Sequence, residues 1–171
     1  EIRLSLVGSE MCIRDRKKVN IMQYEIVNMK EKTVAGFAAR TNNSSADMRK
    51  TICGLWKRFY SSEGAALNAH KTNNKTLGIY TDYSSDENGD YTAMAACEVD
   101  GINIPEGFET RKIPSGKYAK FIVKGNMTRA VQEFWISLWN MRLPRSFLFD
   151  FEEYQNSDCE NAEIHIYISL K

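Results

Sequence analysis

The sequence lacks the features that mark several common protein classes. It has no long run of Lys and Arg, and its formal net charge is +1, whereas a surface that binds nucleic acid normally shows clustered basic residues. It also has no apolar stretch as long as a membrane span requires. We therefore expect that this chain does not bind nucleic acid directly and does not insert into a membrane.

Cysteine is too scattered to suggest a metal or redox centre. No two of the four cysteines form a CxxC pair, the usual spacing of a zinc site or a redox dithiol; they are Cys12, Cys53, Cys97 and Cys159. Without a convincing secretory signal, free thiols in a cytoplasmic protein are the simplest interpretation. The acidic loop 86–90 lacks the ligand spacing of a calcium site. We therefore expect no metal and no cofactor.

The first 21 residues look foreign to the rest of the chain. Segment 5–16, SLVGSEMCIRDR, resembles the translated read-through of a sequencing adapter that turns up in assembled metagenomic data. We interpret residues 1–21 as a non-native or disordered leader and expect the natural start at Met22. Residues 22–171 then have the length of one large domain or two small ones.

Residues 128–154, TRAVQEFWISLWNMRLPRSFLFDFEEY, hold the most informative pattern in the chain. The first half predicts a helix, because apolar residues recur at the spacing of one helical face. That face comprises Val131, Phe134, Trp135, Leu138 and Trp139. Asn126 or Thr128 can cap its first turn, and Pro144 disfavours helical geometry in the residue before it.

The second half of the stretch, 147–154, predicts a strand rich in aromatic residues that carries Glu152 and Glu153 side by side. A carboxylate among aromatic rings, next to a helix with two tryptophans on one face, suits a cationic, partly apolar ligand. The alternative is an ordinary amphipathic helix packed on an ordinary strand. In that case the aromatic rings are core and both glutamates lie in water.

The rest of the chain predicts a mixture of strands and one further helix. Segment 24–41 is extended with a polar break at 30–32, and residues 46–62 predict a helix that carries Trp56. Strands are expected at 76–83 and 91–99, joined by a turn at Asn88-Gly89. The last strand, 162–170, alternates cleanly, with Ile164, Ile166, Ile168 and Leu170 on one face.

The layout of the first half occurs again in the second half. Residues 24–41, YEIVNMKEKTVAGFAART, align without gaps with residues 108–125, FETRKIPSGKYAKFIVKG. Each segment reads as strand, polar turn and apolar strand, followed by a helix that carries tryptophan. We therefore predict an α+β fold made of a duplicated β-α-β-β unit. Its repeats span about 22–103 and 104–171, and its antiparallel sheet carries two main helices and a central ligand cleft.

Six segments along the chain form a recognisable series, namely LWKRF (55–59), LGIYTDY (77–83), YTAMAACEVD (91–100), IPSGKYAKFIVKG (113–125), FWISLWNMRLPRS (134–146) and FEEY (151–154). They resemble the GyrI-like small-molecule-binding family, the effector-binding domain of AraC-type and multidrug-responsive regulators. Their order and spacing cover nearly the whole chain from Met22 to its end. The resemblance implies the same duplicated β-α-β-β fold.

The resemblance also implies a binding site. Multidrug-binding members of the family hold cationic, lipophilic compounds with a buried glutamate and aromatic rings, and the FExY pattern assigns that glutamate to Glu152. Glu153 is then expected to face solvent, since adjacent strand residues point to opposite faces. The predicted ligand-binding residues are Glu152, Trp135, Trp139, Tyr118, Trp56, Tyr80 and Tyr154. Departures from the family pattern at Ser169, Ala95 and Ala96 leave the identity of the ligand open.

Three functions compete at this point. The first is a stand-alone module that binds small amphipathic or cationic molecules; if it regulates transcription, a protein partner supplies the DNA contact. The second is a hydrolase of small strained electrophiles with Glu152 as general base. The third is a gyrase-interacting or other protein-binding module. No nucleophile–base pair is evident. We interpret His70 and His165 as surface or hydrogen-bonded histidines and Cys97 as a small core residue. We therefore expect binding and assign no catalytic residue.

Overall fold

The computed structural model describes residues 22–171, and the expected leader, residues 1–21, lies outside them. The first half of the fold comprises β1 (Glu25–Met29), β2 (Lys32–Asn42), α1 (Met48–Phe59), the short 3-10 helix η1 (Gly64–Ala69), β3 (Thr76–Thr81) and β4 (Asp90–Glu98). The second half comprises β5 (Glu109–Ile113), β6 (Gly116–Gly125), α2 (Met127–Trp139), β7 (Phe149–Tyr154) and β8 (Ala162–Ser169). Two strands, a helix and two strands thus follow one another twice.

The strand boundaries of the two halves match the alignment of segments 24–41 and 108–125. β1 begins at Glu25 and β5 begins at Glu109, which are aligned positions. β2 and β6 begin at Lys32 and Gly116, also aligned. Two residues separate each pair of strands, at 30–31 and 114–115, and the first of these breaks is one residue shorter than the predicted break at 30–32. The predicted duplication is therefore present in the backbone as well as in the residue pattern.

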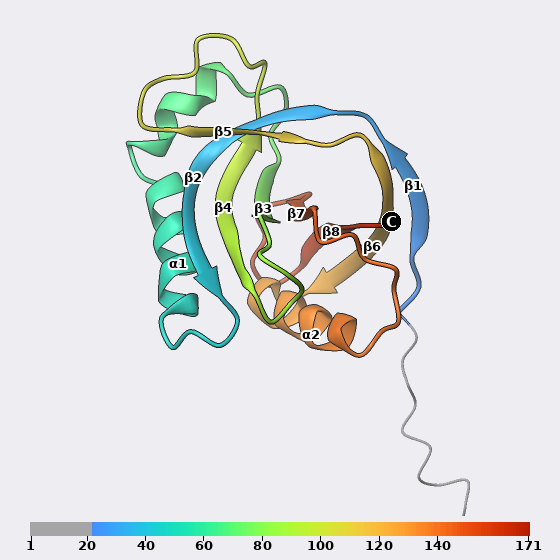
Figure 1. The fold of residues 1–171 in the computed structure, drawn as a ribbon. Helices are drawn as coiled ribbons and strands as arrows, with labels where there is room; N and C mark the ends of the chain where they lie inside the picture. Colours follow the sequence, from blue (N-terminus) through green and yellow to red (C-terminus); the bar gives the residue numbers. More distant parts are fainter. Residues whose placement is uncertain (1–21) are drawn as a thin grey trace, which may run out of the picture.

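All eight strands join one antiparallel sheet in the order β1-β6-β8-β7-β3-β4-β2-β5. The sheet curls into a half-barrel, with both main helices on its outer side (Figure 1). The first strand of each half is exchanged, because β1 pairs with β6 and β5 pairs with β2. The two halves meet at the pair β3–β7 in the centre of the sheet. The predicted α+β class, antiparallel sheet and two main helices are confirmed.

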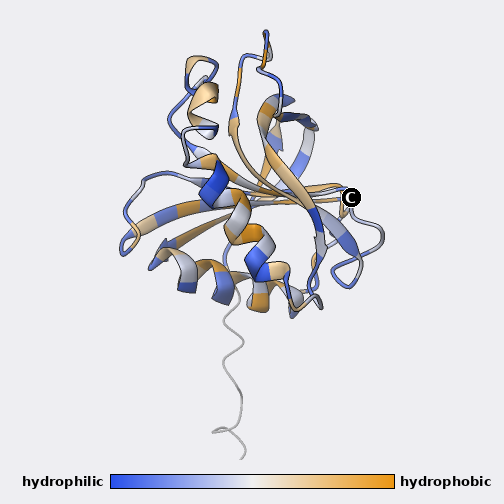
Figure 2. Cartoon of the chain, turned by 90° about the vertical axis from the view of Figure 1, so that its left-hand side faces the viewer, coloured by the Kyte–Doolittle hydropathy of each residue, from blue (hydrophilic) through white to orange (hydrophobic). Residues whose placement is uncertain are grey.

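The helices cover different parts of the outer face. α1 packs on β2 and β4 through Leu55 and Phe59, and α2 packs on β6 and β8 through Phe134 and Leu138. The strands across the middle of the molecule are largely hydrophobic and the connecting loops mostly hydrophilic (Figure 2). Asn126 caps α2 as predicted, since its side chain accepts a hydrogen bond from the Arg129 N–H at 3.2 Å.

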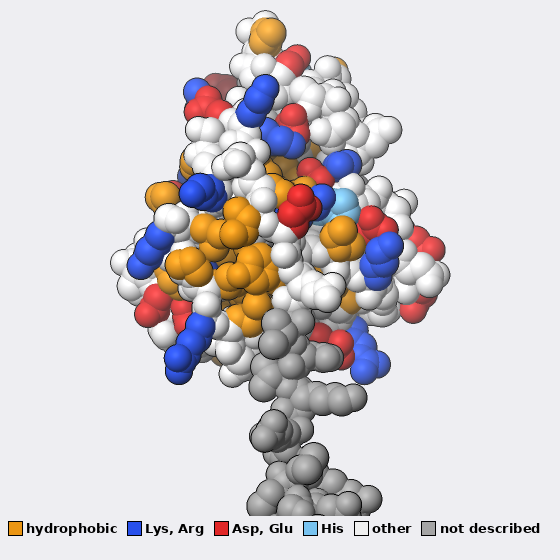
Figure 3. All heavy atoms as spheres, turned by 90° about the vertical axis from the view of Figure 1, so that its right-hand side faces the viewer, with side chains coloured by type: hydrophobic (Ala, Val, Ile, Leu, Met, Phe, Trp, Pro, Cys, Tyr) orange, Lys and Arg blue, Asp and Glu red, His pale blue; other side chains and the backbone are white. Residues whose placement is uncertain are grey.

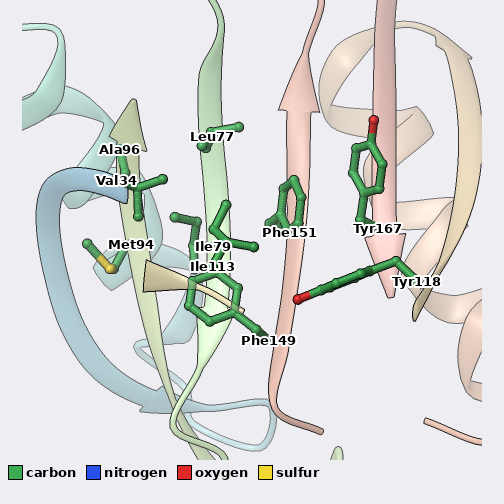
Figure 4. Packing of buried hydrophobic residues seen from close by; sticks show 10 residues of the cluster. All are labelled: Val34, Leu77, Ile79, Met94, Ala96, Ile113, Tyr118, Phe149, Phe151 and Tyr167. Atoms are coloured by element: carbon green, nitrogen blue, oxygen red, sulfur yellow. The ribbon is translucent and has the colours of Figure 1, made fainter. Parts of the chain in front are cut away.

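The inner face of the curled sheet carries its own hydrophobic cluster (Figure 4). The cluster draws buried side chains from both halves, among them Ile79, Met94, Tyr118 and Phe151. The rings of Phe151 and Tyr167 stack with centroids 4.6 Å apart. The inner face of the central strands is therefore covered by this cluster. None of the helices in residues 22–171 is long and apolar enough to cross a membrane.

Candidate functional site

The candidate site lies on β7, one of the two strands at the centre of the sheet. Its residues alternate between the two faces. Phe149 and Phe151 join the inner cluster, whereas Asp150, Glu152 and Tyr154 point to the outer face. The outer face at this position lies between the regions that α1 and α2 cover, so side chains from both helices can reach it.

Glu152 is buried, with 1% of its surface exposed. Its Oε1 accepts hydrogen bonds from the Tyr80 hydroxyl at 3.0 Å and from Trp135 Nε1 at 2.7 Å. Its Oε2 accepts one from the Tyr154 hydroxyl at 2.7 Å. These donors come from β3, α2 and β7, and all of them are neutral. Among residues 22–171, no Lys, Arg or His forms a salt bridge with Glu152.

Burial and hydrogen bonding act in opposite directions on the acidity of Glu152. Burial raises the pKa of the carboxyl, the three hydrogen bonds lower it by less, and the pKa stays above its ordinary value. Burial and the nearby charge of Glu152 raise the pKa values of Tyr80 and Tyr154 well above the usual tyrosine range. Both hydroxyls therefore remain protonated and available as donors.

Aromatic rings surround the carboxylate. Trp135 lies edge-on to Tyr80 with ring centroids 5.0 Å apart, and Trp56 lies edge-on to Tyr154 at 5.4 Å. Gly78, which lies opposite Glu152 in the register of β3 and β7, makes room for this arrangement. A Cβ at Gly78 would lie 2.8 Å from Glu152 Oε2 and 3.3 Å from Trp56 Cζ2. One tryptophan from each helix thus reaches the region around the same carboxylate.

The structure brings together five of the seven predicted ligand-binding residues and leaves two apart. Tyr118 lies in the inner cluster (Figure 4), where its hydroxyl donates to the carbonyl of Pro114 at 2.9 Å. Trp139 is the last residue of α2 and is 43% exposed. It lies to one side of the buried face, whose centre is Phe134 and Leu138, because each residue advances about 100° around a helix. Neither residue forms a hydrogen bond with Glu152.

The expectation that Glu153 faces solvent is wrong. Glu153 does point to the face opposite Glu152, but it is only 5% exposed. Its carboxylate accepts hydrogen bonds from Lys75 at 3.1 Å and from Gln155 at 2.8 Å, and Lys32 Nζ lies 3.9 Å away. The reason is the curl of the sheet, which turns the second face of β7 toward the interior of the half-barrel instead of toward water.

Sequence reasoning missed a second buried carboxylate on the outer face, Asp150. It accepts hydrogen bonds from Arg145 at 2.8 Å, from the Tyr83 hydroxyl at 3.0 Å and from the backbone N–H of Ser169 at 2.8 Å. Arg145 is itself buried and forms a salt bridge with Asp150. The period-two alternation in FDFEEY could have found Asp150, because it places this residue on the same face as Glu152.

The other residues considered from the sequence lie away from this site. His70 is near Asp100, with 3.7 Å between Nδ1 and Oδ1, and His165 is near Glu163, with 3.0 Å between Nε2 and Oε1. Cys97 is a core residue of β4, and burial raises the pKa of its thiol to about 11. Within the described part of the chain, no three His, Cys, Asp or Glu side chains gather closely enough to hold a metal ion.

Comparison with protein families gives one matching model, described as "Cass2: Integron-associated effector binding protein", which covers residues 25–170. The crystal structure of the integron cassette protein VCH_CASS2 from the mobile metagenome of Vibrio cholerae is similar to this chain. The two are 26% identical with a TM-score of 0.71, and the match covers 86% of this chain and 95% of that protein.

Two further proteins are similar to this chain, the first of them in its fold. SAV2435, whose structure was solved bound to tetraphenylphosphonium, has a TM-score of 0.73 at 22% identity, and the match covers 88% of this chain and 94% of that one. YobU of Bacillus subtilis (strain 168), provisionally named as a transcriptional regulator, is 29% identical over 155 residues. That alignment covers 85% of this chain and 96% of YobU.

Proposed function

Since the chain belongs to the Cass2 family of integron-associated effector binding proteins, we propose that it binds small amphipathic cations at Glu152. The ligand's positive charge lies against the carboxylate, and its apolar groups lie against the surrounding aromatic rings. The protein acts as a binder that senses or sequesters such compounds, and it does not transform them.

The proposal rests on one observation. Among residues 22–171, no positively charged side chain forms a salt bridge with Glu152. Three acidic residues of β7 are buried, namely Asp150, Glu152 and Glu153. Arg145 neutralises the first, and Lys75 with Lys32 neutralises the third. Glu152 has only neutral donors. A buried ionised carboxylate without a cationic partner is costly, and a ligand that brings a positive charge relieves this cost.

The aromatic surroundings support a ligand that is apolar as well as charged. Trp56, Tyr80, Trp135 and Tyr154 lie around the carboxylate. The face of each ring can attract a cation by about 0.5–2 kcal/mol, and the rings also offer apolar contact area. A small hydrated ion would gain little from such a site. A lipophilic cation with its charge spread over rings or alkyl groups gains from both terms.

The ligand of a structural relative has this chemistry. SAV2435 was solved with tetraphenylphosphonium, a lipophilic cation with a single charge. The fold is shared, and we propose that the ligand class is shared as well. In the present structure the aromatic side chains cover Glu152, so entry of such a ligand requires Trp56 or Trp135 to move aside.

The regulatory part of the proposal follows from a different relative. YobU is named in connection with transcriptional regulation. We propose that this protein detects its ligand in the cytoplasm and passes the signal to a protein partner that contacts DNA, so that the chain itself does not bind DNA. Ligand-dependent association with that partner is then the output of the site.

A thermal-shift series tests the binding proposal. A ligand that binds only the folded protein raises the melting temperature. We expect tetraphenylphosphonium and hydrophobic quaternary ammonium ions to raise it, and triphenylphosphine oxide, an uncharged analogue, to raise it much less. Analysis of the same mixtures for reaction products distinguishes a binder from a hydrolase. Equal shifts with charged and uncharged compounds would contradict the proposal.

An exposed hydrophobic surface supports protein binding as a second candidate function. On the side of the molecule away from α1, hydrophobic side chains gather in a patch with Lys and Arg near its margin (Figure 3). Tyr24 and Ile26, beside and within the edge strand β1, are both exposed. Exposed apolar patches often mark contacts between proteins. Sedimentation of the wild-type protein and of Ile26→Ser over a range of concentrations tests whether this side mediates self-association.

A further inference from the structure

We propose that Arg145 determines the charge selectivity of the Glu152 site. By neutralising Asp150, it leaves one uncompensated carboxylate on the outer face of β7 and thereby favours ligands with a single positive charge. The inference rests on the proposed function, namely that Glu152 holds a cation. It assigns a specificity role to a residue that does not contact Glu152.

The first step is the spacing of the two acids. Asp150 and Glu152 are two residues apart on one strand and share a face, so their Cα atoms are roughly 7 Å apart. At this distance, charges in a partly buried site interact appreciably. Tyr80 connects the two positions, because it lies opposite Asp150 in the sheet register and donates its hydroxyl to Glu152. A cation that binds Glu152 is therefore within the electric field of Asp150.

The second step is the contrast between their partners. Asp150 has a cationic partner, Arg145, whose side chain is 7% exposed. Its remaining hydrogen bonds come from neutral groups of Tyr83 and Ser169. Arg145 also forms a longer salt bridge with Glu87, at 3.8 Å between Nη1 and Oε2, and this pair is the weaker of the two because the Glu87 side chain is partly exposed to water. Together, Asp150 and Arg145 contribute almost no net charge, and Glu152 contributes one negative charge.

The third step is that the loop between α2 and β7 fixes the position of Arg145. The backbone of Arg145 forms a β-bridge with Leu170, and the N–H of Ser146 donates to the carbonyl of Ser169 at 2.9 Å. The guanidinium lies over the ring of Phe147 at 4.2 Å, and Phe147 has a φ of 54°. Few residues other than Gly adopt this conformation. The loop therefore holds the guanidinium in contact with Asp150.

The experiment uses two aromatic cations of similar shape, methyl viologen with two charges and methylphenylpyridinium with one. Their dissociation constants are measured by calorimetry on wild type, Arg145→Met, Asp150→Asn and the double variant Arg145→Met/Asp150→Asn. In Arg145→Met both carboxylates lack a protein cation. We expect the preference for the dication over the monocation to rise at least about tenfold relative to wild type.

The double variant is the matched control, because it removes the ion pair while keeping a single negative charge. We expect its preference to return to that of wild type. Asp150→Asn leaves Arg145 with only its longer salt bridge to the partly exposed Glu87, and we expect this variant to bind both cations at least about tenfold more weakly than the double variant. If the single variant Arg145→Met does not fold, the comparison of Asp150→Asn with the double variant still tests the inference.

The outcomes separate this inference from the proposed function. If wild type binds neither cation, the proposed function fails. If wild type binds the monocation but all folded variants keep the same preference, Arg145 has a structural role only and the inference is overturned. A loss of thermal stability in Arg145→Met that leaves the ratio of the two dissociation constants unchanged also overturns it.

Discussion

The acidity of Glu152 links ligand binding to pH in a defined direction. Burial holds the pKa of Glu152 above its ordinary value of 4.5 in the folded protein. At a pH between the pKa of the unfolded chain and the higher pKa of the folded protein, folded Glu152 keeps the proton that the unfolded chain has released. The contribution of Glu152 to stability is therefore fully present below 4.5 and is lost as the pH rises through the folded pKa.

Binding of a cation has the opposite dependence, because the cation prefers the ionised carboxylate. We predict that affinity for tetraphenylphosphonium increases with pH over this window while the melting temperature of the free protein falls relative to Glu152→Gln. Titration calorimetry and thermal denaturation from about pH 4 to about pH 8 measure both quantities. Affinities that vary with pH to the same extent in wild type and Glu152→Gln would show that another group is responsible.

The neighbouring residue Glu153 should behave differently. Burial would raise its pKa, but hydrogen bonds from Gln155 and Lys75 and the charges of Lys75 and Lys32 hold the pKa below its ordinary value. We predict that Glu153→Gln lowers the free energy of unfolding by about 1–3 kcal/mol, because it weakens charge-assisted hydrogen bonds. Denaturant unfolding measures this loss. Affinity for cations should change little, and a large loss of affinity would place Glu153 in the binding site.

The sequence alone was enough to single out Glu152 but not to describe its surroundings. The alternation of FDFEEY separates Glu152 from Glu153, and the structure agrees with that separation. The same alternation gives no information on whether the second face is in water, because this depends on the curl of a sheet assembled from distant strands. The partners of Asp150 also come from distant positions in the chain, since Tyr83 and Ser169 belong to different halves.

At the scale of single elements, the close contact between β3 and β7 offers a direct test. Ala at Gly78 would bring a Cβ within 2.8 Å of Glu152 Oε2 and 3.3 Å of Trp56 Cζ2. We predict that Gly78→Ala destabilises the protein by about 1–3 kcal/mol and weakens cation binding, because the carboxylate or the indole must shift. Calorimetry and denaturant unfolding measure the two effects.

Gly54→Ala is the matched control for Gly78→Ala. Gly54 lies within α1, and a Cβ at this position would meet nothing within 4 Å. Alanine is favoured over glycine inside a helix by about 1 kcal/mol. This variant should therefore be slightly more stable than wild type and bind cations normally. If Gly78→Ala also behaved in this way, the space beside Gly78 would not be critical for the site.

Most helices and strands could be predicted from residue patterns, whereas the ends of some could not. The alternating isoleucines place β8 correctly, and Asn126 marks the start of α2. α2 ends at Trp139, several residues before Pro144, so Trp139 lies at the end of the helix and is partly exposed. Helix periodicity alone groups Trp135 with Trp139. Only the packing of Phe134 and Leu138 shows which of the two tryptophans faces the sheet.

For the whole molecule, the exchange of first strands makes the two halves dependent on each other. β1 pairs with β6 and β5 pairs with β2, and the inner cluster draws residues from both halves. We predict a single cooperative unfolding transition, with far-UV and near-UV circular dichroism giving the same midpoint. Two separate transitions would mean that one half remains folded without the other.

The repeat visible in the sequence already predicts the duplicated fold. The resemblance of segments such as FEEY (151–154) indicates the effector-binding family, and the family model that matches residues 25–170 confirms it. The exchange of β1 and β5 is not visible in the alignment, because a strand with the same pattern can pair within its own half or with the other half. The pairing of β3 with β7, which joins the two halves at the centre of the sheet, is not visible in the alignment either. The site therefore depends on a topology that local residue patterns do not encode.

The central claim is that the buried charge of Glu152 attracts the ligand, and titration of Glu152→Gln with tetraphenylphosphonium tests it most directly. The substitution keeps the shape of the side chain and removes its charge. The binding free energy for tetraphenylphosphonium should weaken by about 2–5 kcal/mol, as when one side of a buried charge pair is removed. Binding of uncharged triphenylphosphine oxide should change much less. Equal affinity of wild type and Glu152→Gln for tetraphenylphosphonium would contradict the claim.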